Sequence, residues 1–237
     1  MATLSGKVAI VTGGTRGIGR AIAERLLREG AAVAVCGRSR ENVQAFVKEC
    51  QSFAGDRLLA EAADVSKLDD VRRFFENVDA RFGALDILIN NAGIGVFKSV
   101  ADLTPEEWRR TIDLNLSGVY YCSHEALPRM KKRDAGYIVN IGSLAGKNAF
   151  AGGAAYNASK FGLNGFSEAM MLDHRYENIR VSCIMPGSVD TEFGKRTGAA
   201  PWKIQPEDVA EVVATLLCMP ARTLVSRVEM RPSKPAK

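Results

Sequence analysis

Short apolar runs alternate with segments of helical pattern along almost the whole chain. The runs are apolar on both faces, which is typical of strands in a parallel sheet that is covered on both sides. They cover residues 7–12, 32–36, 57–62, 85–90, 137–141 and 180–185, with a weaker run at 227–230. The segments between them predict helices over about 17–29, 40–53, 66–82, 105–132, 156–176 and 206–218.

This alternation predicts an α/β fold, a single-domain Rossmann-like doubly wound parallel β-sheet of about seven strands, flanked by helices on both faces. The chain of 237 residues suits one such domain, since it contains no internal repeat and no linker rich in Pro, Gly or Ser. We expect the domain to cover residues 1–230. The polar and proline-containing residues 231–237, "RPSKPAK", predict a flexible tail.

The composition, with 46% hydrophobic and 25% charged residues, indicates a globular protein. No apolar stretch approaches the roughly 18 residues of a membrane span, and the N-terminal residues form no signal-peptide pattern. The five cysteines are widely spaced and include no C-x-x-C pair, which favours reduced thiols in a reducing compartment. We therefore expect a cytoplasmic protein without a membrane partner. Because the chain has two histidines, we also expect no metal site.

The net charge of +5 and the isoelectric point near 9.0 raise the question of a nucleic-acid partner. Lys and Arg are interspersed with Asp and Glu along nearly the whole chain, however, so we expect no nucleic-acid binding. A small polyanionic ligand explains the surplus positive charge more simply.

Tyr156 and Lys160 in "YNASK" lie one helical turn apart, so their side chains share one helix face. A nearby cation stabilises a phenolate, and tyrosine needs such a neighbour to exchange protons near neutral pH, because its pKa is ordinarily about 10. The pair is equally compatible with an ordinary helix surface. Other motifs have to decide between these interpretations.

The segment "TGGTRGIG", residues 12–19, follows the first strand and opens the first helix, where a glycine-rich turn binds a dinucleotide. Gly13 permits a tight turn, Gly17 the close approach of a pyrophosphate, and Gly19 the close packing of helix on strand. The N-terminus of the helix supplies N–H donors for phosphate. A purely structural glycine turn is the alternative.

The end of the second strand indicates which dinucleotide is bound. NAD sites usually carry an acidic residue there, which binds the ribose 2′-hydroxyl. This chain reads "VCGRS" instead, so no carboxylate repels a 2′-phosphate, and Arg38 and Arg16 are placed to bind one. Each arginine alone could be an ordinary surface cation. Together with the missing acid they predict NADP(H) as the cofactor.

These motifs, with "NNAG" at 90–93 and a serine at 143, resemble the short-chain dehydrogenase/reductase family in order and spacing over residues 5–230. The resemblance implies that Tyr156 is the catalytic acid/base and that Lys160 binds the nicotinamide ribose and lowers the pKa of the tyrosine. It implies that Ser143 faces the substrate carbonyl and that Asn115 binds a proton-relay water. The family's usual Ser-Ser reads Gly142-Ser143 here.

The resemblance also implies a set of cofactor contacts along the carboxyl edge of the predicted sheet. It assigns Asp64 and Val65 to the adenine ring and "PGSVDT", residues 186–191, to the nicotinamide carboxamide. Taken singly, each segment could be turn chemistry. The expected contacts are Gly13, Thr15, Arg16, Gly17, Ile18, Gly19, Gly37, Arg38, Ser39, Asp64, Val65, Asn91, Ala92, Gly93, Tyr156, Lys160, Pro186, Gly187, Val189 and Thr191.

The segment between Gly187 and Pro206 predicts a lid over the substrate. Together with Ser143, Phe193 and Trp202 are the candidate substrate contacts, and Gly194 and Gly198 give the lid freedom to move. An ordinary surface loop is the alternative.

We expect an NADP(H)-dependent carbonyl reductase or hydroxy-acid dehydrogenase-like enzyme, acting on a small carbonyl or secondary alcohol substrate. One alternative is a 3-oxoacyl-acyl-carrier-protein reductase, with Lys131, Lys132 and Arg133 as a docking patch for the acidic carrier. Another is a non-catalytic NADP-binding redox sensor. The resemblance also implies a homo-oligomer, a tetramer or dimer built on the helices predicted at 105–132 and 156–176.

Overall fold

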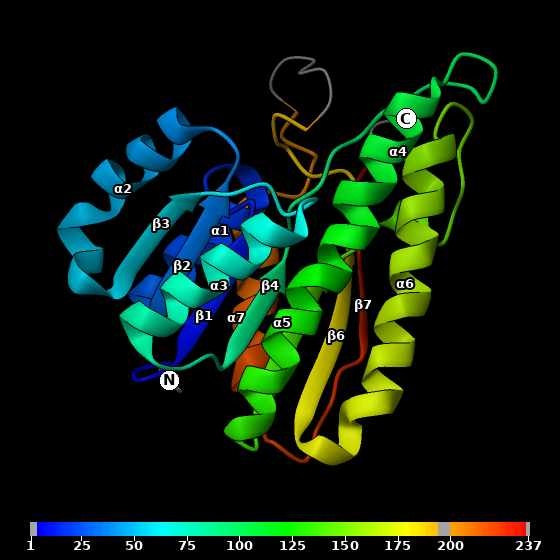
Figure 1. Ribbon diagram of the computed structural model, residues 1–237. Coiled ribbons are helices and arrows are strands. Elements are labelled where there is room, and N and C mark those ends of the chain that lie inside the picture. Colours follow the sequence, from blue (N-terminus) through cyan, green and yellow to red (C-terminus); the bar gives the residue numbers. More distant parts are fainter. Residues whose placement is uncertain (1–3, 194–199, 236–237) are drawn as a thin grey trace.

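The computed structural model describes residues 4–193 and 200–235. Seven parallel strands form one sheet in the order β3-β2-β1-β4-β5-β6-β7 (Figure 1). Their bounds are β1 Val8–Thr12, β2 Ala32–Gly37, β3 Leu58–Ala62, β4 Ile87–Asn90, β5 Gly136–Ile141, β6 Ile179–Pro186 and β7 Arg227–Met230. The predicted doubly wound Rossmann-like sheet is confirmed. Its strand order reverses between β1 and β4, where such folds bind their ligands.

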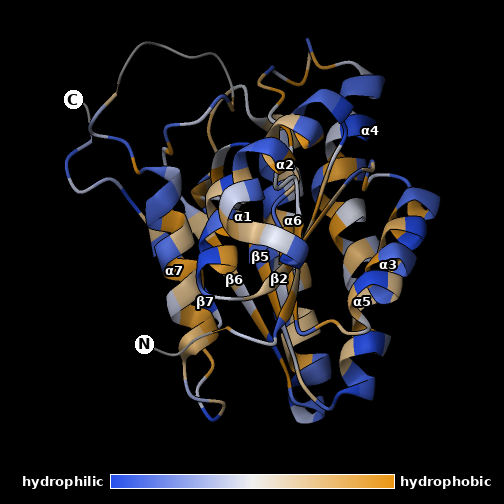
Figure 2. Cartoon of the chain, turned by 90° about the vertical axis from the view of Figure 1, so that its left-hand side faces the viewer, coloured by the Kyte–Doolittle hydropathy of each residue, from blue (hydrophilic) through white to orange (hydrophobic). Residues whose placement is uncertain are grey.

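Two layers of helices cover the sheet. On one face α1, α2 and α7 bury Leu26, Phe46 and Val213, and on the other α3, α5 and α6 bury residues that include Phe75 and Met130. Figure 2 shows the apolar residues gathered on the strands and on the inner sides of the helices. The helices are α1 Gly17–Arg28, α2 Arg40–Ala54, α3 Leu68–Phe82, α4 Pro105–Ile112, α5 Gly118–Lys132, α6 Ala154–His174 and α7 Pro206–Cys218.

The helix predicted over 105–132 is helical throughout but contains a π-helical turn. A π-helical turn, Asp113–Ser117, separates α4 from α5. Within this turn the Asn115 side chain bonds the main chain of Ile94 and the Ser159 hydroxyl, and these residues lie far away in the sequence. Because those partners are tertiary, helical periodicity alone could not predict the π turn, and π turns of this kind are frequent at functional sites.

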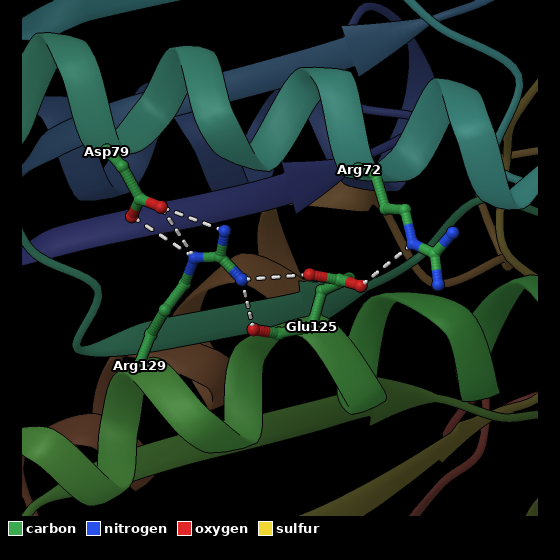
Figure 3. Close-up of polar contacts among 4 residues, drawn as sticks. All are labelled: Arg72, Asp79, Glu125 and Arg129. Carbon is green, nitrogen blue, oxygen red and sulfur yellow. Dashed lines mark hydrogen bonds and ion pairs between the residues drawn. The ribbon is translucent and has the colours of Figure 1, made fainter.

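An ion-pair network joins α3 to α5 (Figure 3). The Arg129 guanidinium donates to both carboxylate oxygens of Asp79, at 3.1 and 2.9 Å from Nε, and to Glu125 at 3.0 Å. Glu125 in turn pairs with Arg72 at 3.5 Å. Arg129 also lies over the Phe75 ring, 5.2 Å from its centroid, so it contributes both charge and apolar contact to the packing of these helices.

The cysteines divide into four buried residues and one exposed residue. Cys36, Cys50, Cys122 and Cys183 are buried, whereas Cys218 is exposed at the end of α7. Burial raises the pKa of Cys36 to about 12 and that of Cys50 to about 11. Across the described ranges, no helix has the length and apolar character that crossing a bilayer requires.

Candidate active site

A cleft of about 1030 Å³ opens along the carboxyl edge of the sheet. Every strand contributes to it a residue that ends the strand or follows it closely. In strand order along the chain these are Gly13, Gly37, Ala63, Asn91, Gly142, Gly187 and Arg231. The cleft therefore lies at the position that the strand order predicts for a ligand.

The glycine turn between β1 and α1 forms one end of the cleft. Gly13 has φ +62°, and a Cβ atom there would lie 2.9 Å from Cα of Ala92. A Cβ on Gly19 would lie 2.4 Å from the Gly13 carbonyl oxygen, so this glycine permits the helix to approach the turn. Gly19 itself is not among the residues that line the cleft. The predicted roles, a tight turn at Gly13 and close packing of helix on strand at Gly19, agree with this geometry.

Asn91 holds the segment after β4 against the glycine turn. Its side-chain amide donates to the carbonyls of Thr12, at 2.9 Å, and Gly13, at 3.1 Å. The Thr12 hydroxyl accepts from the backbone N–H groups of Asn91 and Ala92, at 3.0 and 3.1 Å. Sequence reasoning missed Thr12, whose signal was a hydroxyl at the last position of an otherwise apolar strand.

The corner beside β2 has a basic lining. Gly37, Arg38, Ser39 and Asn42 line it, and Arg16 faces it from the glycine turn. The Ser39 hydroxyl accepts from the Asn42 N–H at 3.1 Å and so caps α2. Among the described lining residues the one carboxylate is that of Glu192, which pairs with Arg16 at 3.8 Å.

Tyr156 and Lys160 lie together on the first turns of α6. Lys160 Nζ donates to the Ile141 carbonyl at 2.9 Å and lies 5.9 Å from the centroid of the Tyr156 ring. A hydrogen bond joins Tyr156 to Ser143, whose hydroxyl also accepts from the Ala145 N–H at 3.1 Å. The structure thus brings three members of the predicted tetrad to one point of the cleft.

The fourth member, Asn115, lies beneath the cleft rather than in its lining. Its Oδ1 accepts from Ile94 N–H at 2.8 Å, and its Nδ2 donates to the Ile94 carbonyl at 2.9 Å and to Ser159 Oγ at 3.0 Å. Ser159 Oγ donates to the Tyr156 carbonyl at 2.8 Å. Asn115 therefore connects the loop after β4 to the turn of α6 that carries Tyr156.

Burial sets the pKa values of this pair. Burial lowers the pKa of Lys160 to about 8. It raises the pKa of Tyr156, and the hydrogen bond from Ser143 opposes that rise. The family expectation that Lys160 lowers the pKa of the tyrosine stays a prediction, because in the protein by itself desolvation of the phenolate is the largest effect on the pKa of Tyr156.

Asp64 is also not among the residues that line the cleft. Its carboxylate accepts from the Ser66 N–H at 3.1 Å and from the Ser66 hydroxyl at 2.7 Å, so it organises the turn after β3. Apart from Asp64 and Gly19, the expected cofactor contacts all line the cleft, and so do Phe193 and Trp202.

The segment from 187 to 206 is held at its base. Val189 forms a parallel bridge with Ile204, and Asp190 N–H donates to the Ile204 carbonyl at 2.8 Å. Gly194 and Gly198, the expected sources of lid motion, lie outside the described residues.

Several lining residues escaped sequence reasoning. Phe97 and Phe150 come from the loops before α4 and α6, and Arg231, Pro232 and Pro235 come from the segment after β7. Gly187 N–H donates to the Met230 carbonyl at 2.9 Å, which places that segment beside the turn after β6. From sequence, residues 231–237 were predicted only to form a tail, because the contact of Arg231, Pro232 and Pro235 with the cleft depends on how β7 pairs with β6.

Comparison with known proteins identifies the family. The model for short chain dehydrogenases matches residues 7–202. A metagenomic short-chain oxidoreductase in complex with NADP is 38% identical, with a TM-score of 0.86 over 99% of this chain and 100% of the other. A serine dehydrogenase in complex with NADP⁺ is 32% identical, with a TM-score of 0.88 over 97% and 96% of the two chains. The 3β-hydroxysteroid dehydrogenase of Mediterraneibacter gnavus is 37% identical over 194 residues, 81% of this chain and 70% of that protein.

The chain belongs to the short-chain dehydrogenase family and is an oxidoreductase. The named relatives act on different substrates, so the family alone does not define the substrate. Within residues 4–193 and 200–235, no group of three or more His, Cys, Asp or Glu side chains is arranged to bind a metal ion.

Proposed function

We propose that this protein transfers a hydride between NADP(H) and a carbonyl or secondary alcohol group of a small substrate. The observation that carries the proposal is the meeting of Tyr156, Lys160 and Ser143 at one point of the cleft that the switch in strand order creates. A phenol hydrogen-bonded to a hydroxyl, with a buried cation beside it, is suited to moving one proton at a substrate oxygen.

Reduction of a carbonyl requires a hydride at carbon and a proton at oxygen, and the nicotinamide supplies the hydride when it is bound. The Tyr156 hydroxyl donates the proton to the substrate oxygen. Ser143 donates a hydrogen bond to the same oxygen as negative charge develops there. Lys160 lies close enough to favour the phenolate that remains, and Asn115 holds the turn of α6 that carries Tyr156.

The choice of NADP(H) over NAD(H) rests on the corner beside β2. Arg38 and Arg16 supply two guanidinium groups there, and no acidic residue at the end of β2 opposes a 2′-phosphate. Two of the similar structures were obtained with NADP or NADP⁺ bound, which supports the same choice.

The experiment that tests the function is Tyr156→Phe, assayed for NADPH consumption with a panel of ketones and aldehydes. The variant keeps the ring and loses the proton donor, so we expect turnover to fall by roughly 10²-fold or more. NADPH affinity, measured by nicotinamide fluorescence, should stay close to that of the wild type. Turnover near the wild-type value would contradict the assignment of Tyr156.

A cofactor arm of the same experiment uses Arg38→Ala. Loss of a charge-assisted hydrogen bond should weaken NADPH binding by roughly 10-fold or more and leave NADH binding unchanged. Arg40→Ala is the matched control, because Arg40 is an exposed neighbour that does not line the cleft. Equal affinities for NADPH and NADH in the wild type would overturn the choice of cofactor.

The alternative functions gain no support from the geometry. Lys131, Lys132 and Arg133 lie at the end of α5, just before β5 begins, and so at the opposite edge of the sheet from the cleft. Lys131 also pairs with Glu177 and Arg133 with Asp86. A carrier protein docked there would be remote from Tyr156. A redox sensor without catalysis would need none of the tetrad, and NADPH consumption in the assay above excludes it.

We also propose a homo-oligomer located in the cytoplasm. The outward sides of α5 and α6 expose Tyr120, Phe161 and Leu172, which is the apolar character expected of an interface between copies of the chain. The cysteine usage supports a reducing compartment.

A further inference from the structure

Three phenylalanines form a contiguous group beside Tyr156 and have no part in the proton transfer. We call Phe97, Phe150 and Phe193 the phenylalanine cage. The Phe97 ring centroid lies 5.5 Å from that of Tyr156, 5.9 Å from that of Phe150 and 6.5 Å from that of Phe193. The Phe193 and Tyr156 centroids are 5.7 Å apart. Phe97 and Phe193 thus border the Tyr156 ring, and Phe150 extends the group through Phe97.

The cage rings leave much of their apolar surface open inside the cleft. Phe97 is 47% exposed, and Phe150 and Phe193 are each 45% exposed, although all three line a concave site. Exposed aromatic rings grouped around a catalytic residue mark a place where apolar ligand surface is buried.

The backbone is shaped to accept these rings. A Cβ on Gly95 would lie 2.6 Å from Phe97 and 2.8 Å from Phe193, and a Cβ on Gly153 would lie 2.7 Å from Phe150. The rings therefore rest on glycine backbone, and a Cβ at either position would require a ring to shift. A parallel bridge between Lys98 and Gly153 joins the Phe97 segment to the Phe150 segment. The cage is a built feature of three loops rather than a chance grouping.

Two of the cations on this side of the cleft pair with carboxylates, and the buried Lys160 donates to the Ile141 carbonyl. Lys203 pairs with Asp190 at 3.8 Å, and Arg231 pairs with Glu229 at 3.0 Å. A substrate carboxylate would have to compete with these partners, whereas an uncharged apolar group would contact the three rings directly.

We infer that the substrate is an uncharged ketone, or the corresponding secondary alcohol, that carries a carbon ring next to the reacting carbon. The inference rests on the proposed hydride transfer and names its substrate class. The ring packs against the phenylalanine cage, and the carbonyl oxygen meets the hydroxyls of Tyr156 and Ser143. The ketone, NADPH and one proton yield the alcohol and NADP⁺, so the proton from Tyr156 and the hydride balance the reduction.

The test separates binding from chemistry. Calorimetry on the Tyr156→Phe variant, saturated with NADPH, measures the affinities of acetophenone, cyclohexyl methyl ketone, butanone and 3-oxobutanoate. We expect both ring ketones to bind about 10-fold or more tightly than butanone, because the ring buries much more apolar area. Binding of 3-oxobutanoate should be weaker than that of the ring ketones.

Variants of the cage give the second readout. Phe97→Ala and Phe150→Ala should each reduce the affinity for both ring ketones by about 3-fold or more and leave butanone unchanged, since each removes one aromatic contact. Phe97→Leu, which keeps an apolar side chain, should lose less affinity for the ring ketones than Phe97→Ala. Tyr176→Ala is the control, because it removes a ring that is 91% exposed and does not line the cleft. It should leave the affinities for all four compounds unchanged.

The outcomes separate this inference from the function on which it rests. If butanone or 3-oxobutanoate binds as tightly as the ring ketones, or if the cage variants leave the preference intact, the assigned substrate class is wrong. The ring ketones could also bind preferentially while the wild type consumes no NADPH with any of the four compounds. In that case the cage binds rings as inferred, and the proposed hydride transfer is wrong.

Discussion

The fold brings the pKa of Lys160 close to physiological pH. Its ammonium group is buried against the Ile141 carbonyl, and burial lowers its pKa to about 8. The neighbouring phenol of Tyr156 moves the other way, since burial raises its pKa. In the protein without ligand, the pair is therefore a neutral phenol beside a cation that loses its proton in mildly alkaline solution.

This shift predicts a pH-dependent contribution to stability. Unfolded lysine titrates near 10.4, so between about pH 8 and pH 10.4 the unfolded chain holds a proton that the folded chain has released. The free energy of unfolding should therefore rise with pH in this range, by as much as about 3 kcal/mol from this group. Urea titrations of the wild type and Lys160→Met at several pH values measure the difference.

The Lys160→Met variant should lack that rise, while Lys48→Met, at an exposed position on α2, should follow the wild type. Parallel pH profiles for the wild type and Lys160→Met would contradict the buried, easily deprotonated lysine.

The helices and strands show how far local sequence determines structure. Alternation of apolar runs with helical patterns predicted all seven strands, and α7 begins and ends where its pattern predicts. The π turn at Asp113–Ser117 was missed, because the bonds that Asn115 makes within it reach Ile94 and Ser159. Tyr156 and Lys160 were candidates from the spacing of a motif, and Ser143 and Asn115 from the resemblance to a family. Phe97 and Phe150 were not predicted, because the approach of Phe97 to Tyr156 and of Phe150 to Phe97 depends on tertiary packing of separate loops.

Two glycines in helices predict opposite effects of the same substitution. A Cβ on Gly118, at the start of α5, would lie 2.8 Å from the Val65 carbonyl oxygen, so Gly118→Ala must displace backbone. We expect it to lower the free energy of unfolding by about 1–3 kcal/mol. A Cβ on Gly165 in α6 would meet no atom within 4 Å, so Gly165→Ala should raise that free energy by up to about 1 kcal/mol.

Denaturant unfolding of both variants compares them directly. If both variants changed the free energy of unfolding equally and with the same sign, the close approach of α5 to the segment after β3 would not constrain position 118.

At the level of the whole molecule, the reversal of strand order between β1 and β4 gathers residues from all seven strands into one cleft. The cofactor side of that cleft could be predicted from sequence, because its glycines and arginines lie in short motifs. On its substrate side Ser143, Phe193 and Trp202 were candidates from sequence, whereas Phe97, Phe150 and the segment after β7 were not, since no local pattern connects them to Tyr156.

The distribution of cysteines predicts a simple pattern of thiol reactivity. An alkylating reagent should modify Cys218 rapidly in the folded protein and the other four cysteines only when the protein opens, because they are buried. The Cys218→Ser variant should lose the rapid phase. More than one rapid modification per chain in the wild type would contradict the burial of the other four.

Three of these four buried cysteines distinguish the two faces of the sheet. Cys50 packs in the core beneath α1, α2 and α7, whereas Cys36 and Cys122 pack in the core beneath α3, α5 and α6. Pulse alkylation followed by peptide mass spectrometry would therefore time the exposure of each layer separately. The order in which these peptides gain mass would show whether the two layers detach together or one before the other, without introducing any foreign probe.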